Sequence, residues 1–458
     1  MKETMVMKQE RISDFLSNQT IIPILPNRYS YFLSKKRNYS HWFMLTPILL
    51  SKQVIDVNVL KHAFSYLLQY HDSLRINVHF LNNELIQTIE PFKKSFYSTC
   101  NLYLYKKDCG LSFKNYVEDK IQLEKQNISF PDKLLKFLVF HNVDNEITVL
   151  AFLFHHILAD GYSFKILMED LFDIYEQILQ NKAVALSNKR TSYKKFCEHS
   201  INFFKKNLKE ESAYWKKMPW STTHRLSFDY QNDISSNIEG NTVSSISSIN
   251  LDSIDNFMDN FKGEGSYGLV KILLIAIAKA YKCHFNSNTM LINYVYNGRF
   301  CSDESLHLDR TVGWFSEGAP IFIPTKDSLK SLINTVEAQI DKLYYNNSSY
   351  GYLKYIFQEL KDDFFPPEIS INYTPPWLGE SKYKNFMVPT SEFNSHLSPP
   401  ANTQRVYLLN AKAYFSEKTF ILSWNYSRTL FDKSKMDKFS SNCLVELKNI
   451  MNELYKSF

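Results

Sequence analysis

Two adjacent histidines, His155 and His156, are followed by Asp160 and Gly161, and this set is the part of the chain best suited to chemistry. An imidazole gains and loses a proton near neutral pH. A carboxylate at this spacing can organise a turn or pair with a cation, and a glycine lets the main chain approach a ligand closely. The residue types therefore point to proton transfer between bound reactants.

The elements on either side of this set must position it. The apolar run Ile147–Phe154 predicts a buried strand, and the helical spacing of apolar residues over 162–181 predicts a helix. Successive strand side chains point to opposite faces, so a strand that continues through both histidines presents only one of them to a given cavity. Gly161 would lie at the N-terminus of the helix, where negative charge is favoured.

The same residues also have a purely structural interpretation, with His155 and His156 as core histidines and Asp160 as a helix N-cap. The combination of all four residues at a strand end and a helix start favours a chemical role instead. A metal site is not expected, because adjacent histidines on opposite strand faces chelate poorly. No cluster of Cys and His with ligand spacing follows them.

The composition is that of an ordinary soluble globular protein, with 458 residues, 44% of them hydrophobic and 22% charged. This length allows two or three domains. Charges are spread through the N-terminal segment, so no secretory signal is apparent. No apolar stretch approaches the length of about 20 residues that spans a bilayer. We therefore expect a cytoplasmic protein with no membrane partner.

The cysteines argue against a disulfide-bonded protein, and the charges argue against a nucleic-acid-binding protein. The 6 cysteines are scattered without paired spacing, which favours free thiols. The net charge of +6 is carried by small clusters, too dispersed and too mixed with acids to indicate nucleic acid. These clusters are Lys35–Arg37, Lys93–Lys94, Lys194–Lys195, Lys205–Lys206 and Lys216–Lys217.

Helical and strand patterns alternate along the chain, which predicts an α/β (or α+β) class. The stretch 219–242 is rich in Ser, Asn and Asp and is interpreted as a connection. Helices are expected at 57–71, 111–126, 162–181, 191–216, 252–262, 266–283, 327–345 and 432–456. Strands are expected at 39–50, 243–250, 288–296, 368–373, 405–414 and 418–426, with paired strands within 75–89 and 134–155.

The set from His155 to Gly161 resembles the active-site motif of the condensation-domain superfamily of nonribosomal peptide synthetases, which is related to chloramphenicol acetyltransferase. Other segments resemble further motifs of this family in the same order along the chain. They are Leu67–Arg75, Ser192–Phe196, Ala213–Lys217, Asn297–Arg299, Arg310–Phe315, Asn425–Arg428 and Leu430–Asp432. Several matches in the right order are far more specific than any one of them.

The resemblance implies a fold of two chloramphenicol-acetyltransferase-like lobes in a V-shaped pseudo-dimer with a central tunnel. Residues 1–218 would form the N-terminal lobe, which carries the histidine motif, and 219–458 the C-terminal lobe. A latch-like loop is expected near 374–404, which contains five prolines.

The resemblance also implies an acyltransferase that joins a carrier-bound acyl or aminoacyl thioester to an amine, or to an alcohol. The donor would be held on the phosphopantetheine of an acyl or peptidyl carrier protein, and the acceptor would be a small-molecule or carrier-bound amine. No bound cofactor and no metal are expected. Because no adenylation or carrier segment is recognisable, we expect a free-standing enzyme with its carrier in trans. Some of the basic clusters would receive this acidic partner.

Roles for single residues follow from the resemblance. His156 would act as the base or position the amine, whereas His155 would be structural. Asp160 would pair with Arg299. Gly161 would let the substrate pass and contribute its amide to the oxyanion.

Four further residues are weaker candidates for a role at the site. Ser163 would donate a hydrogen bond to the substrate or cap the helix. Trp314 would line the tunnel or pack in the core. Arg75 would be a structural ion-pair partner, and Asn372 would contact the substrate.

Two alternatives stay open at this stage. The epimerization branch of the family carries a glutamate three positions before the glycine of its "GR" pair, and this chain has Val295 at that position. Valine cannot transfer a proton, so condensation is favoured over an epimerase-like activity. The other alternative is a noncatalytic module that docks carrier proteins.

Overall fold

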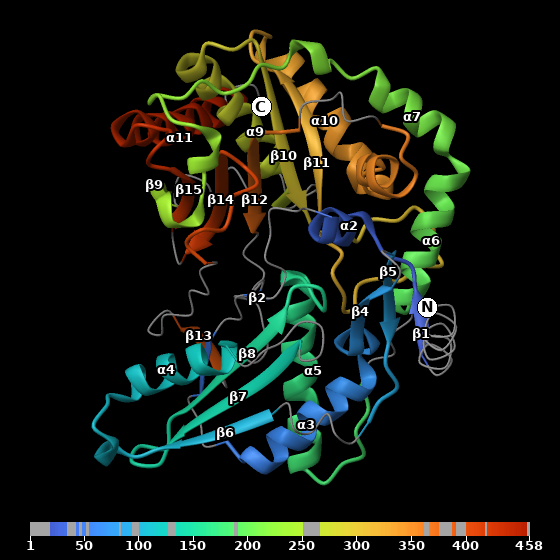
Figure 1. Cartoon of the computed structure of the whole chain (residues 1–458), viewed down its shortest axis with the longest axis vertical. Helices are drawn as coiled ribbons and strands as arrows, with labels where there is room; N and C mark the ends of the chain where they lie inside the picture. The colour runs from blue at the N-terminus through green and yellow to red at the C-terminus, as the bar shows by residue number, and fades with distance from the viewer. Residues whose placement is uncertain are drawn as a thin grey trace, which may run out of the picture.

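The computed structural model describes residues 19–33, 43–44, 48–51, 55–81, 84–93, 100–126, 134–186, 191–250, 266–360, 366–374, 387–390, 400–416 and 419–455. Figure 1 shows these residues as two groups of elements, one around each of two large sheets, with the helices α6 (Tyr193–Lys206) and α7 (Leu208–Lys216) on the right beside the upper group. Among the described helices, none is long and apolar enough to cross a membrane.

The first large sheet carries the histidine motif at the end of a central strand. Its strands are, in spatial order, β13 (Met387–Thr390), β3 (Ile48–Ser51), β8 (Thr148–His155), β7 (Leu135–Asn142) and β6 (Cys100–Tyr105), with β2 (Phe43–Met44) also paired to β8. Every residue of β8 is buried. Helices cover both faces of this sheet, which explains why β8 is apolar from Val149 to Phe154.

The two faces of this sheet have separate apolar cores. One face packs on α3 (Val57–Tyr70) and α5 (Gly161–Leu179), and the other packs on α4 (Phe113–Gln126). The Phe152 ring contacts the Phe164 ring of α5 edge-on, with 5.6 Å between centroids. These contacts fix the direction in which the chain leaves β8 and enters α5.

The second large sheet mixes parallel and antiparallel strands. Its order is β11 (Glu317–Pro324), β10 (Thr289–Tyr296), β12 (Ile369–Thr374), β14 (Leu409–Ser416), β15 (Thr419–Ser427) and β9 (Thr242–Asn250). The strand β12 runs parallel to both of its neighbours, and the other pairs are antiparallel. The helices packed in this part are α9 (Ser266–Phe285), α10 (Leu329–Asn346) and α11 (Lys433–Tyr455).

Smaller elements complete the described chain. A three-stranded sheet has the order β1 (Thr20–Ile22), β5 (Glu84–Ile89) and β4 (Ile76–Leu81), and it is accompanied by the helix α2 (Pro26–Leu33). Single turns of 3-10 helix lie at Asp72–Arg75, Lys107–Cys109, Trp220–Thr222, Ile234–Ser236 and Glu239–Asn241, and a π-helical turn lies at Tyr352–Ile356.

The mixed α/β class predicted from the sequence is confirmed, whereas some of its elements differ from the prediction. The helix expected over 191–216 is two helices, α6 (Tyr193–Lys206) and α7 (Leu208–Lys216). The break is at Asn207, whose side-chain amide donates to the Phe203 carbonyl at 2.9 Å. The sequence prediction also lacks the helix α2 and the strands β1, β6, β11 and β13. The helix expected at 252–262 and most of the segment 374–404 lie outside the described residues.

One strand of the first sheet comes from a distant part of the chain. The strand β13 follows β12 of the second sheet in sequence, yet it pairs antiparallel with β3 of the first sheet, Met387 opposite Ser51 and Thr390 opposite Ile48. Figure 1 shows β13 at the edge of the lower group of strands. The polypeptide therefore crosses between the two large sheets twice more, from β12 to β13 and back to β14, in addition to the route through α6 and α7.

Candidate active site

The two histidines occupy different environments. The strand β8 ends at His155, which is fully buried. Its ring lies 5.8 Å from the Tyr31 ring, and its Nδ1 accepts the Ile157 N–H at 3.3 Å. The first residue beyond the strand, His156, is only partly buried. Ending the strand here places one imidazole in the core and leaves the other reachable.

An aromatic ring from the second half of the sequence packs against the partly buried imidazole. The Trp314 ring lies 4.6 Å from the His156 ring, with 45° between their planes. The indole Nε1–H donates to Ser316 Oγ at 3.0 Å, so Trp314 is itself held in place. Because Trp314 is buried, it forms one wall beside His156.

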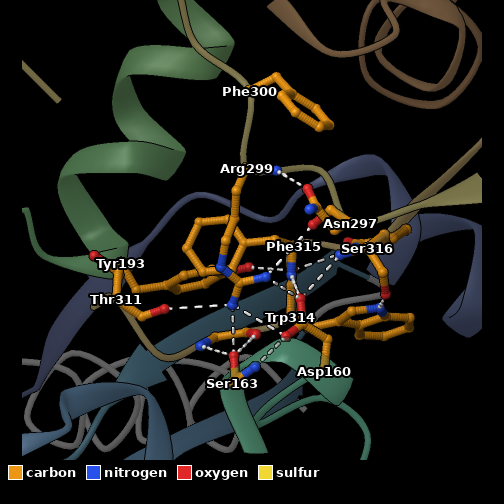
Figure 2. Close-up of polar contacts among 12 residues, drawn as sticks. Asp160, Ser163, Tyr193, Asn297, Arg299, Phe300, Thr311, Trp314, Phe315 and Ser316 are labelled. Atoms are coloured by element: carbon orange, nitrogen blue, oxygen red, sulfur yellow. Dashed lines mark hydrogen bonds and ion pairs between the residues drawn. The ribbon is translucent and has the colours of Figure 1, made fainter. Parts of the chain in front are cut away.

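The carboxylate of Asp160 joins the start of α5 to the segment 297–316. Its Oδ1 accepts the Ser163 N–H at 2.9 Å, as expected of an N-cap. Arg299 binds both oxygens, Nη1 to Oδ2 at 2.8 Å and Nη2 to Oδ1 at 3.0 Å. Figure 2 shows this contact together with the main-chain N–H groups of Phe315 and Ser316, which donate to Oδ2 at 3.0 and 3.2 Å.

This bonding decides the charge of Asp160. Burial by itself raises the pKa of the carboxyl, but the Arg299 charge and the hydrogen bonds from Arg299 and Ser163 outweigh it, so the pKa lies below its ordinary value. The group is therefore an anion at neutral pH. Both oxygens already accept hydrogen bonds from protein groups, which suits Asp160 to holding the loop rather than to accepting a substrate proton.

The Arg299 cation is enclosed by aromatic rings and by the Ser163 hydroxyl. Its guanidinium lies 4.1 Å from the Phe315 centroid and 4.7 Å from that of Tyr162, favourable cation–π distances. Nη2 donates to Ser163 Oγ at 2.7 Å. The same hydroxyl donates to the Gly313 carbonyl at 2.8 Å and accepts the Gly313 N–H at 3.1 Å. A hydroxyl offers one donor and two acceptors, so protein groups use all of its capacity.

Two glycines allow these segments to approach so closely. Gly298 has φ +66°, and a Cβ there would lie 1.8 Å from the Phe315 carbonyl oxygen. A Cβ at Gly313 would lie 2.2 Å from the Tyr193 ring. Gly161 differs from both, because it is exposed and is the first residue of α5. Its N–H is one of the helix-start donors that have no partner within the helix.

A second buried network links other segments of the matched sequence. The Asp170 carboxylate on α5 contacts His71 Nε2 at 2.8 Å and accepts a hydrogen bond from Arg310, which also bonds to Glu169. The segments around 71 and 310, far apart in the chain, are therefore both fastened to the helix that begins at Gly161.

Two of the residues singled out in the sequence lie elsewhere. The guanidinium of Arg75 donates to the carbonyls of Glu90, Leu68 and Gln69, and the ion pair expected of it stays a prediction. Two of these belong to the last turn of α3, where carbonyls lack partners within the helix, so Arg75 caps that helix. None of the hydrogen bonds described above joins Asn372 to the Asp160 network. Asn372 is exposed on β12.

Sequence reasoning missed a buried cation beside the motif. Arg28 of α2 is fully buried, and its Nη2 donates to the Ile157 carbonyl at 2.6 Å. It also donates to the Tyr193 hydroxyl, which in turn donates to the Trp314 carbonyl at 2.8 Å. Arg28 thus holds both the turn after His156 and the main chain of Trp314. A lone arginine in an amphipathic stretch gives no sequence signal of these distant partners.

A second missed residue is Glu317, which is buried at the start of β11. The Tyr296 hydroxyl donates to its Oε2 at 3.4 Å. Burial raises the pKa of this carboxyl to about 8, with the Tyr296 hydrogen bond opposing the shift. At neutral pH Glu317 is therefore mainly protonated, whereas in the unfolded chain it is ionised.

This difference predicts how stability depends on pH. The folded state binds one more proton than the unfolded state between the unfolded pKa of about 4.3 and the folded pKa, so the free energy of unfolding falls as pH rises through this range. We expect Glu317→Gln to remove this contribution to the pH dependence. The free energy of unfolding of the variant, relative to that of wild type, should therefore rise with pH up to about 8. Urea titrations of both proteins from pH 5 to 9 measure it. A difference in the free energy of unfolding between the two proteins that is the same at every pH would contradict the raised pKa of Glu317.

The site geometry can be compared with known proteins. A family model described as "Condensation domain" matches residues 18–457. Among curated proteins, bacitracin synthase 2 of Bacillus licheniformis is 28% identical over 400 residues, which cover 84% of this chain. One of the linear gramicidin synthase proteins of Brevibacillus parabrevis is 23% identical over 450 residues, or 94% of this chain. The chain spans only 14% and 6% of the lengths of these two relatives.

Solved structures show the same fold. The epimerization domain from the third module of tyrocidine synthetase B aligns with a TM-score of 0.81 at 19% identity, over 95% of this chain and 97% of that one. The starter condensation domain of rhizomide synthetase RzmA, crystallised with C8-CoA and Leu-SNAC, aligns with a TM-score of 0.71 at 11% identity, over 96% of both chains.

Proposed function

The chain belongs to the condensation-domain family, and from this premise we propose that it transfers an acyl or aminoacyl group from a carrier-bound thioester to an amine. The product is an amide, and the carrier thiol is released. The reaction serves nonribosomal peptide or related secondary-metabolite biosynthesis. The observation that supports this proposal most directly is the reachable imidazole of His156, held beside Trp314 at the junction of β8 and α5.

A thioester is already activated, so the protein has three tasks. It aligns the two reactants, and well-oriented reactants can lower the barrier by about 7–11 kcal/mol. It removes the proton of the attacking amine, the role that we assign to His156. It also stabilises the tetrahedral oxyanion, for which the exposed N-terminus of α5 offers the N–H of Gly161, which has no partner within the helix, and the positive end of the helix dipole.

We assign the remaining residues of the site to positioning. Asp160, Arg299 and Ser163 fasten the start of α5 to the segment that carries Trp314. His155 packs in the core. Catalysis in this scheme depends on His156 and on the N-terminus of α5, and the surrounding ion pair fixes the distance between them.

The proposed donor is a phosphopantetheine thioester on a carrier protein that acts as a separate chain, and the acceptor is a small-molecule or carrier-bound amine. The experiment supplies acylated carriers and candidate amines and follows the carrier mass and the amide product by intact-mass spectrometry. Acyl loss with matching amide formation supports condensation, with His156→Ala as the control. Deuterium uptake at the α-carbon of an aminoacyl carrier would indicate epimerization instead. A stable complex without turnover would indicate docking alone.

The helices α6 and α7 are the proposed surface for the carrier, because exposed lysines follow one another along them. These are Lys195, Lys205, Lys206, Lys209, Lys216 and Lys217. An acidic carrier and its phosphate would meet positive charge along these two helices, which Figure 1 shows on one side of the molecule.

Charge reversal at Lys205 and Lys206 together is expected to weaken carrier binding by a factor of about 3–10, since exposed ion pairs contribute up to about 1 kcal/mol each. The salt dependence of the Kd should become shallower as well. Titration calorimetry at two salt concentrations measures both effects. The control is Lys93→Glu, an exposed lysine that belongs to neither helix. Equal weakening by the control would contradict this surface.

A further inference from the structure

A cysteine, a histidine and an aspartate lie close together where the segment after Arg299 contacts α6. Cys301 Sγ lies 3.4 Å from His199 Nε2, and His199 Nδ1 lies 3.5 Å from Asp303 Oδ2. The thiol is partly buried. The side chains of His199 and Asp303 are 25% and 41% exposed, so solutes can reach the cluster.

The order of the three groups is that of a nucleophile, a base and a residue that orients the base. For the thiol to donate to Nε2, the imidazole must carry its proton on Nδ1, the nitrogen that faces the Asp303 carboxylate. The pKa of Asp303 is lowered mainly by hydrogen bonds from the Ser305 side chain and main chain, with further help from His199 and Lys195. The carboxylate is therefore an anion that favours this tautomer.

Burial raises the pKa of the Cys301 thiol, although a hydrogen bond from the Asp303 main chain opposes it. At neutral pH the thiol therefore stays protonated on its own, and its reactivity depends on a base in direct contact with it. The charged groups around that base are Asp303 and Lys195, together with the Lys194–Glu198 pair on the same helix.

We propose that Cys301 is a nucleophile that accepts acyl groups from thioesters, with His199 as its general base and Asp303 as the orienting residue. Sγ attacks the thioester carbonyl while His199 Nε2 takes the thiol proton. The tetrahedral intermediate collapses, the bond from carbon to the leaving sulfur breaks, and the proton passes to that sulfur. The products are an S-acyl Cys301 and a free thiol. The thioester class is taken from the proposed function, but no step requires His156.

The test uses the full chain, butyryl-N-acetylcysteamine as the acyl donor and iodoacetamide as a donor-independent probe of the thiol. Peptide mass spectrometry follows each cysteine separately. Cys109 and Cys283 are exposed free thiols and serve as internal controls. We expect both probes to label Cys301 faster than these controls. We expect His199→Ala to slow the labelling of Cys301 by about 10²-fold, the smaller end of general-base effects, and to leave the controls unchanged.

The wild-type pH profile gives a second measurement that needs no variant. A rate assisted by a base in contact with the thiol departs from the profile of simple thiol ionisation. A rate governed by simple thiol ionisation keeps rising through about pH 8.5.

A His199→Gln variant that labels as fast as wild type, or a Cys301 profile that follows Cys109, would overturn the proposal. Rapid iodoacetamide labelling without acylation would also overturn it, since the nucleophile would then lack the proposed substrate. Labelling preserved in His156→Ala separates this site from the proposed condensation.

Discussion

Replacing His156 by alanine is expected to slow acyl transfer by a factor of about 10²–10⁴, the usual contribution of a positioned general base. The residue lies just beyond the end of β8, partly exposed and against the Trp314 ring. Its truncation therefore removes the base without opening the buried core of the sheet. The measurement is the initial rate of amide formation from a carrier thioester under saturating donor.

The control for this prediction is His155→Ala. His155 is fully buried and accepts a hydrogen bond from Ile157. Its loss is expected to lower the free energy of unfolding by about 1–3 kcal/mol, because a buried donor loses its partner. The rate per folded molecule should fall less than in His156→Ala. A His156→Ala enzyme that keeps more than half of the wild-type rate would remove the base from the proposed mechanism.

Replacing Asp160 by asparagine is expected to lower the free energy of unfolding by about 3–5 kcal/mol, because it leaves a buried guanidinium without its anion. The side chains of Arg299 and Asp160 are only 6% and 3% exposed. Chemical denaturation monitored by tryptophan fluorescence and by circular dichroism measures the change. The matched control is Asp437→Asn, whose partner Lys433 is 65% exposed. Such exposed pairs contribute at most about 1 kcal/mol.

A double substitution separates the cost of the lone charge from the value of the pair. Asp160→Leu with Arg299→Met removes both charges, so we expect it to be less destabilising than Asp160→Asn alone. Since the folded pKa of Asp160 is lowered, the stability from its ionisation is present above its unfolded pKa of about 3.9 and is lost as pH falls through the folded value. An Asp160→Asn protein as stable as wild type would contradict this interpretation.

The sequence predicts the local frame of the site because its signals are local. A continuous apolar run followed by polar residues marks the end of β8, and helical spacing marks α5. Alternation along a strand already implies that one histidine is buried and the other accessible. The structure adds which is which: the strand stops at His155, and His156 begins the turn.

Contacts between distant segments have no comparable signal. Arg28 lies 129 residues from the carbonyl that it binds, and Cys301 lies 102 residues from His199. Neither pair follows from periodicity or composition, because only the topology of the fold brings the segments together. The strand β6 was missed for a related reason. Only its two end residues are buried, and the four between them alternate between half-exposed and exposed positions, so its identity as a strand becomes plain only from its parallel pairing with β7.

The pairing of β13 with β3 also has a consequence for dividing the protein into pieces. A fragment that ends near residue 218 lacks Met387–Thr390, so the main-chain groups of Ile48–Ser51 that face this strand would be left open to solvent. Unprotected strand edges recruit strands from other molecules. We therefore expect such a fragment to self-associate, and a version that carries the 387–390 strand on a short tether to stay monomeric.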